Sequence, residues 1–298
     1  MAAPTVVIVH SRGVRPRPGV INEGLAARML DRGLTRLTGA ATPQDAIRTL
    51  FAPTERVGVK INAIAGRELS TPPETAVPFA RLLVGGGLEA RRIIIWDRTN
   101  RELKAAGYRL NQDGTEFRVF GTDSAGVGYV REPLVHRSVA SRFSSILTDQ
   151  IDASVSFAVL KDHGLAGFSG GMKNYFGAIH NPNKYHETNC NPGVADVFDA
   201  PPVKSKHRLT ILDALTVQFH RGPSFHPKWA EGSERLVFGL DPVAVDAVGQ
   251  KMIEDLRKSH GLPSLAEDGR PPAYLNTAEN LGLGAGRMES IRLIEDEV

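Results

Sequence analysis

The 298-residue sequence contains a single cysteine, Cys190. One thiol cannot form an internal disulfide, a two-cysteine redox motif or an iron–sulfur cluster held by four thiolates. A metal site in this chain would therefore depend on histidine, aspartate or asparagine, with at most one thiolate. A lone cysteine is more often buried and inert than a ligand.

The sequence also lacks long apolar runs and blocks of like charge. No run reaches the roughly 20 apolar residues of a membrane-spanning helix, so we expect a soluble protein without a membrane partner. Lysine and arginine are spread along the chain and the net charge is only +3, which argues against a nucleic-acid-binding arm. The N-terminus has no export-signal pattern. We therefore expect a cytoplasmic protein, or one exported in folded form if a signal has been removed.

Short apolar runs alternate with segments of helical periodicity along the chain. This alternation predicts an α/β fold with a mainly parallel sheet covered on both faces. The predicted strands are Val6–Val9, Val57–Ile61, Ile93–Trp96, Ser154–Leu160, Leu209–Leu212 and Leu236–Leu240. The predicted helices are Val20–Leu37, Pro43–Phe51, Glu74–Val84, Met172–Ile179, Gly193–Phe198 and Pro242–Lys258. We expect one unit over residues 1–298, which could divide into an N-terminal lobe at 1–145 and a second lobe at 146–298.

Polar residues follow the predicted strand Ser154–Leu160. Lys161 and His163 stand where open parallel sheets bind their ligands. The chain then passes through a glycine-rich run into a predicted helix with Lys173 in its first turn. Because a cation is unfavourable at a helix N-terminus, Lys173 favours an anionic ligand or a covalent partner there. We expect the backbone amides of the run to bind an anion or cofactor, with these residues taking part: Gly167, Ser169, Gly170 and Gly171. The alternative is a turn that only lets the helix pack closely.

Two histidines, His180 and His186, flank the segment NPNKY. Their spacing does not place them on one helical face, but Pro182 indicates a loop that could aim both rings at one point. A pair of metal ligands and a substrate clamp are both consistent with this pattern, and the alternative is two exposed loop histidines. We favour His186 as the metal ligand, because an unbroken α-helix would carry His180 roughly 10 Å from Lys173.

Further polar residues follow other predicted strands. Lys60 and Asn62 lie at the end of one strand, Asp97 follows another and Asp213 a third. If these strands are parallel, the residues share the sheet edge of His163 and could line a common cleft with it. Asp246, within the last predicted helix, could face either this cleft or solvent.

Several motifs together resemble a known family. They are VGVKINAIAG, STPPE, IIIWDR, KDHGLAGFSGGMKNYFGAIHNPNKYH, LTILDAL and DPVAVDAVG, and they run from about Val57 to Lys258. In this order they resemble a widespread bacterial family described only as domain of unknown function number three hundred and sixty-two. Some of its members carry ferredoxin-like iron–sulfur domains, which implies a possible ferredoxin-like redox partner.

A more distant resemblance bears on chemistry. The run HGLAGFSGGMK is similar to the central motif of nickel-pincer lactate racemase. The resemblance implies a lactate-racemase-like core and a metal ion or nickel-containing nucleotide cofactor. His163 would match the acid/base histidine, Lys173 the lysine linked to the cofactor, and His180 or His186 the nickel ligand. That family uses a second acid/base histidine, whereas no histidine lies between His10 and His136 here, so a symmetrical racemase is not expected.

Three functions are consistent with these residues. The first is an enzyme, dependent on a metal or metal cofactor, that acts on a small anionic or hydroxylated substrate in a racemase-, epimerase- or oxidoreductase-like reaction. His163 would be its general base, with Lys161 and Lys173 in the active site. The second is a metal-binding or redox accessory protein without turnover. The third is a small-anion binding protein.

Overall fold

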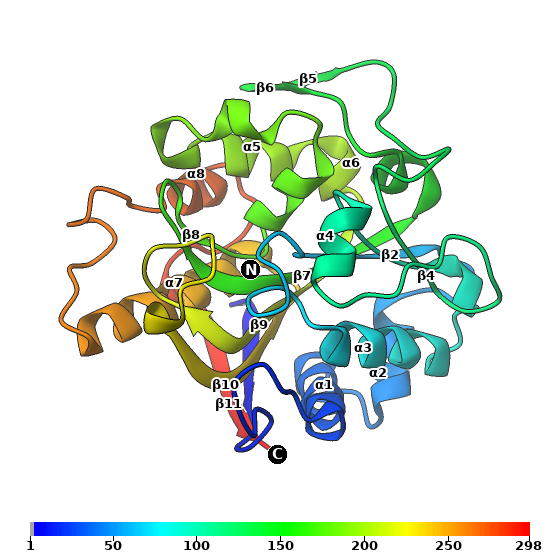
Figure 1. The fold of residues 1–298 in the computed structure, drawn as a ribbon, viewed down its shortest axis with the longest axis horizontal. Coiled ribbons are helices and arrows are strands. Elements are labelled where there is room, and N and C mark those ends of the chain that lie inside the picture. The colour runs from blue at the N-terminus through cyan, green and yellow to red at the C-terminus, as the bar shows by residue number, and fades with distance from the viewer. Residues whose placement is uncertain (1–2) are drawn as a thin grey trace.

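A single nine-stranded sheet forms the centre of the computed structural model, which describes residues 3–298 (Figure 1). Its strands are β1 (Thr5–His10), β2 (Val57–Ile61), β3 (Ile93–Asp97), β4 (Arg118–Gly121), β7 (Ala153–His163), β8 (Gly167–Ser169), β9 (His207–Gln218), β10 (Ala230–Gly239) and β11 (Arg292–Glu297). They lie in the order β11-β1-β10-β9-β7-β2-β3-β4, and β8 pairs with β7. A separate hairpin contains β5 (Leu134–His136) and β6 (Val139–Ser141).

Most of the sheet is parallel, which confirms the predicted fold class. Strands β9, β7, β2, β3 and β4 run parallel to one another, and β11 runs parallel to β1. Strand β10 is antiparallel to both β1 and β9. The connection from β9 to β10 spans residues 219–229 and contains no α-helix. A parallel crossover generally needs a dozen or more residues, so this short connection favours an antiparallel return.

Eight α-helices and several shorter helical turns connect the strands within residues 3–298. The α-helices are α1 (Glu23–Thr38), α2 (Pro43–Leu50), α3 (Pro73–Gly85), α4 (Asn100–Ala105), α5 (Gly193–Asp199), α6 (Pro201–Lys204), α7 (Pro242–Ser259) and α8 (Tyr274–Asn280). The 3₁₀ helices are η1 (Ala90–Arg92), η3 (Lys173–Ala178), η4 (Pro182–Tyr185), η5 (Thr188–Cys190), η6 (Pro227–Trp229) and η7 (Met288–Ser290), and η2 (Ile146–Gln150) is a π-helix. None of the helices in the described part of the chain is long and apolar enough to cross a membrane.

Helices cover both faces of the sheet and create two core layers. Helices α1, α2 and α3 pack on one face, and α5, α7 and α8 on the other (Figure 1). Strand β1 shows the two-residue alternation that this requires. Its Val6 and Ile8 pack in the layer with α5, α7 and α8, whereas Val7 and Val9 pack in the layer with α1, α2 and α3. Strands from both halves of the chain share this sheet, and the division into two lobes stays a prediction.

Local sequence signals explain where the long helices begin and end. Asp241 caps α7 by accepting hydrogen bonds from the amides of Val243 and Ala244, both at 2.9 Å, and Pro242 occupies the first helical position. Helix α1 ends at Gly39, whose φ of 73° is the left-handed conformation that glycine adopts without strain. The helix predicted over Met172–Ile179 is instead the shorter 3₁₀ helix η3.

Candidate functional site

A cavity of about 250 Å³ lies at the carboxyl ends of β2, β3 and β7. Parallel strands bring their carboxyl ends to one edge of the sheet, and side chains distant in sequence meet there. Eight of the residues singled out by the sequence line this cavity: Lys60, Asn62, Asp97, Lys161, His163, Ser169, Lys173 and His186. The expected common cleft therefore forms around these eight residues.

A buried ion pair forms one wall of the cavity. Lys60 Nζ lies 2.6 Å from Asp97 Oδ1 and also donates to the Ile61 carbonyl oxygen and to Asn174 Oδ1. Asp97 Oδ2 accepts from a backbone amide at 2.7 Å. Gly177 is needed beside this pair, because a Cβ there would lie 2.8 Å from Lys60 Nζ. Asn174 and Gly177 were not expected from the sequence. The two opposite charges of the pair satisfy each other and leave little charge for a ligand.

Two other lysines in the cavity have no carboxylate partner among residues 3–298. Lys161 Nζ donates to Asn62 Oδ1 at 2.9 Å and to the Leu69 carbonyl oxygen at 3.2 Å. Lys173 Nζ lies 3.4 Å from His186 Nε2. Burial lowers the pKa of Lys161 to about 7 and that of Lys173 to about 8. A negatively charged ligand would stabilise both ammonium forms.

Two imidazole rings stack beside these lysines. The ring centroids of His163 and His186 are 5.4 Å apart and the rings are inclined by 21°. Burial, followed by the nearby charge of Lys173, lowers the pKa of His163 to about 2. Burial, followed by Lys173, also lowers the pKa of His186. Both rings are therefore neutral near pH 7.

Backbone contacts assign the proton of each neutral ring. His163 Nδ1 accepts hydrogen bonds from the amides of Leu165 and Ala166, both at 3.2 Å, so the ring proton resides on Nε2. His186 Nδ1 lies 3.0 Å from the Pro182 carbonyl oxygen and donates to it, which leaves a lone pair on Nε2. His163 is thus a hydrogen-bond donor toward a ligand. The general-base role expected of His163 does not fit this pattern, whereas His186 can accept a proton.

One protein family and a solved structure are similar to this chain. A family model described as "Domain of unknown function (DUF362)" matches residues 57–251, about two thirds of the chain. The chain belongs to this family. No curated protein matches it. A crystal structure of a Thermotoga maritima protein aligns with 12% sequence identity and a TM-score of 0.45, covering 80% of this chain and 59% of that chain. The chain therefore spans less than two thirds of that structure. The similarity to nickel-pincer lactate racemase stays a prediction.

Two amides at the end of the glycine-rich run of this DUF362 member are already bonded within the protein. The amides of Gly171 and Met172 donate to the Asp246 carboxylate of α7, at 2.6 Å and 3.0 Å. A Cβ at Gly170 would lie 2.4 Å from Asp246 Oδ1, and one at Gly171 would lie 2.4 Å from a Thr210 methyl carbon. The expected anion-binding loop is therefore wrong, because the chain's own carboxylate occupies it. The glycines allow close packing instead.

Gly167 is also structural. It lies in β8, opposite His163 in the antiparallel pairing with β7. Its φ of 79° favours glycine, and a Cβ would lie 2.5 Å from the Arg270 carbonyl oxygen. Of the four residues expected to bind an anion or cofactor in this run, Ser169 is the one that lines the cavity.

His180 lies away from the cavity, so its expected part in a metal site is wrong. The His180 side chain is exposed and packs edge-on against the Tyr129 ring, with centroids 5.2 Å apart. Its amide donates to the Arg142 carbonyl oxygen at 2.9 Å. Because η3 is a 3₁₀ helix that rises about 2 Å per residue, it carries the chain away from Lys173 faster than an α-helix would.

A metal ion would find few ligands in this DUF362 cavity. Within residues 3–298, no group of three or more histidine, cysteine, aspartate or glutamate side chains could hold one. Cys190 is buried, and its Sγ lies 3.9 Å from the His186 carbonyl oxygen. His186 has one feature of a metal-binding histidine, since its Nδ1 is held by a carbonyl oxygen, whereas its Nε2 lies 3.4 Å from Lys173 Nζ. A metal would therefore have to bring most of its donors with it.

Asp213, expected at the same sheet edge, lines a different cavity. It is 3% exposed and faces a space of about 30 Å³ that Arg15 and Ser70 also line. Burial raises the pKa of Asp213 to about 7. Strand β9 continues for five residues beyond Asp213 to Gln218, so Asp213 stands inside the strand and not at its end.

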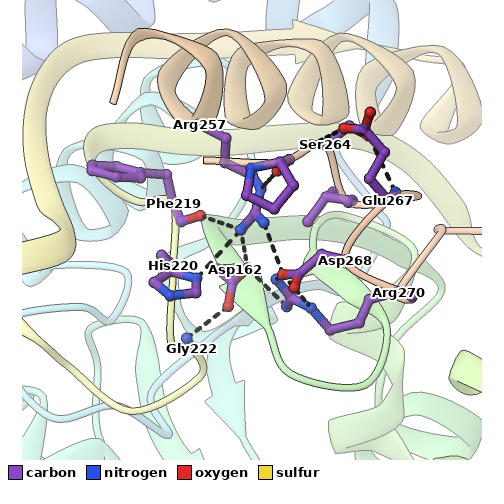
Figure 2. A network of polar contacts seen from close by, with 12 residues as sticks. Asp162, Phe219, His220, Gly222, Arg257, Ser264, Glu267, Asp268 and Arg270 are labelled. Atoms are coloured by element: carbon purple, nitrogen blue, oxygen red, sulfur yellow. Dashed lines mark hydrogen bonds and ion pairs between the residues drawn. The ribbon is translucent and has the colours of Figure 1, made fainter. Parts of the chain in front are cut away.

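A buried network of charges holds the end of β7, immediately before His163 (Figure 2). Asp162 is fully buried, and its Oδ1 lies 2.9 Å from Arg270 and 3.6 Å from Arg257. Arg270 also donates to the His163 carbonyl oxygen at 3.1 Å. The Gly222 amide donates to Asp162 Oδ2 at 2.7 Å. These contacts position the backbone that carries His163. The two arginines lie about a hundred residues along the chain, and no local pattern in the sequence indicates the pairing.

Proposed function

We propose that the cavity is the active site of an enzyme that acts on a small anionic or hydroxylated substrate. The main support is the pair of buried lysines, Lys161 and Lys173, which lack a carboxylate partner within residues 3–298. Buried charges are normally paired, so an anionic ligand would supply the missing partner. Two neutral imidazoles in the same cavity add groups that can exchange protons with that ligand.

The contacts divide the roles among four side chains. Lys161 binds the anionic group of the substrate, because its ammonium is held by neutral oxygens only. His163 donates a hydrogen bond through Nε2–H. His186 accepts the substrate's proton at Nε2, and the Lys173 ammonium donates a proton back to the substrate. The protonated His186 then passes its proton to the neutral Lys173 amine, 3.4 Å away. This set supports proton transfer on a small acid, as in a racemase- or epimerase-like reaction or the proton step of an oxidoreductase.

A metal-containing cofactor is compatible with the cavity if it brings its own donors. Lys173 and His186 would hold it, the first through its amine and the second through Nε2. Such a group would supply Lewis-acid or redox chemistry when bound. Intact mass and elemental analysis of protein from its native host test this part: an adduct lost in Lys173→Met supports it, and the calculated mass without metal contradicts it.

Titration calorimetry with small carboxylates tests the proposed function. Acetate and lactate should bind to the wild-type protein at about pH 6, and the affinity should fall roughly tenfold per pH unit above about pH 7, as Lys161 loses its proton. Lys161→Met should abolish binding, and Lys258→Met, on the surface of α7, should not. Absence of binding to the wild-type protein would refute the proposal.

Proton exchange separates an enzyme from a binding protein. In heavy water, the native-host protein should exchange the C2 hydrogen of a small hydroxy acid, and His186→Ala should slow that exchange by about 10²-fold or more. Binding without exchange would instead support the small-anion binding protein.

A further inference from the structure

Apolar side chains surround the mouth of the lysine-lined cavity. Ile64, just after β2, is 58% exposed, and Leu165, in the turn between β7 and β8, is 50% exposed. Pro223 lines the same opening. Single exposed apolar residues are ordinary, but a group at the entrance of a polar cavity is typical of a ligand-binding site.

An outer cavity continues the inner one toward solvent. It has a volume of about 430 Å³ and is lined by His163, Gly164, Leu165, Asn183, His186 and Pro223. Four of these residues, His163, Asn183, His186 and Pro223, also line the inner cavity. A ligand that reaches the lysines can therefore extend along the outer cavity without leaving the protein surface.

Hydrogen bonds hold this apolar rim in place. The Leu165 amide donates to His163 Nδ1 at 3.2 Å, so the bond that orients the ring also positions Leu165. The Gly164 amide donates to the Gly222 carbonyl oxygen at 3.1 Å, which ties the turn to the segment that carries Pro223. The apolar surface is therefore pre-formed, and a ligand would not have to order it.

We propose that the ligand of this site is an amphipathic carboxylate, with its anionic head at Lys161 and an apolar chain or ring over Leu165 and Pro223. This inference rests on the proposed function for the head group and adds the tail. The inner cavity offers ammonium groups to the head, and the outer one offers apolar side chains to the tail. Burial of a methylene group is worth about fourfold in affinity.

A chain-length series tests the proposal on the full-length protein. Acetate, butanoate, hexanoate and octanoate are titrated by calorimetry at about pH 6, where Lys161 is protonated, together with hexanol as a neutral probe. The expected result is a gain of roughly threefold to fourfold in affinity per added methylene group until the outer cavity is filled. Hexanol should bind far more weakly than hexanoate, because it lacks the charge.

Variants at exposed leucines provide matched controls. Leu165→Ser should reduce the gain with chain length, Leu165→Met should retain most of it, and Leu240→Ser, at an exposed leucine outside both cavities, should leave the series as in the wild type. If acetate binds and chain length has no effect, the inference is overturned and the proposed function stands. If acetate fails to bind and hexanol binds as tightly as hexanoate, both the carboxylate head and the proposed function are overturned.

Discussion

Replacement of Lys161 by methionine should change how the stability of the protein depends on pH. The Lys161 side chain is 1% exposed, and burial lowers its pKa from 10.5 to about 7. Between these two values the unfolded chain retains a proton that the folded chain has lost. Raising the pH through this window therefore stabilises the folded wild-type protein, and lowering it destabilises the protein.

The magnitude follows from the size of the window. Each pH unit over which the two states differ by one proton changes the free energy of unfolding by about 1.4 kcal/mol. From about pH 7 to about pH 9, Lys161 should contribute a gain of roughly 2 to 3 kcal/mol to the wild type. Lys161→Met lacks this gain. The loss of the hydrogen bonds to Asn62 and to the Leu69 carbonyl oxygen adds an offset that does not vary with pH in this window.

Urea unfolding of the wild type and the variant at several pH values measures this difference. Groups that titrate alike in both proteins cancel when one free energy of unfolding is subtracted from the other. Lys258→Met replaces an exposed lysine of α7, and its free energy of unfolding should depend on pH as that of the wild type does. If the free energy of unfolding of Lys161→Met has the same pH dependence as that of the wild type from about pH 6 to about pH 9, Lys161 does not have a lowered pKa. The inference that the cavity holds a buried lysine in need of an anionic partner is then refuted.

Three further variants test the structure around the site. Gly222→Ala should lower the free energy of unfolding by about 3 kcal/mol or more, because a Cβ would lie 1.8 Å from the Asp162 carbonyl oxygen. Gly85→Ala is the control, because a Cβ there would lie 3.7 Å from the nearest atom. Equal effects of the two substitutions in urea unfolding would contradict the packing around Gly222. Arg270→Met should lower the free energy of unfolding by roughly 2–4 kcal/mol and speed amide hydrogen exchange in the turn after β7, because Asp162 loses its nearest cation. Unchanged exchange in this turn would contradict the role of the charge network. Asp246→Ala should lower the free energy of unfolding by about 2–4 kcal/mol, since two buried amides lose their acceptor. A variant as stable as the wild type in thermal unfolding would show that these hydrogen bonds contribute little to stability.

The sequence by itself determined four strands of the parallel core, β2, β3, β7 and β9, and the first residues of helices α2 and α7. The strand predicted at Val57–Ile61 has the observed bounds, because a short apolar run rich in β-branched residues suits a strand buried on both faces. The first residue predicted for the last long helix, Pro242, is also the observed one, because Asp241 and the amides that it caps are neighbours in sequence. The short strands β4, β8 and β11 were not predicted. Their pairing depends on edges that other strands provide.

The sequence also indicated which side chains gather at the site. Lys161 and His163 were predicted from their position after a buried strand, and parallel strands do bring such residues to one edge. Lys173 was predicted from its place after the glycine-rich run. Local spacing favoured His186 over His180 as a metal ligand, which stays a prediction, and His186 is the one of the two that lines the cavity. These inferences worked because they depend on chain direction and on short segments.

Only the tertiary structure decided what the polar groups at the site can do. Gly171 looked free to bind an anion, but Asp246 reaches its amide from a helix 75 residues further along the chain. The donor role of His163 and the acceptor role of His186 depend on which backbone groups meet each Nδ1 atom. The low pKa of Lys161 depends on burial by surrounding elements. Hydrogen-bond partners and burial are properties of the packed chain, and a residue's neighbours in sequence do not specify them.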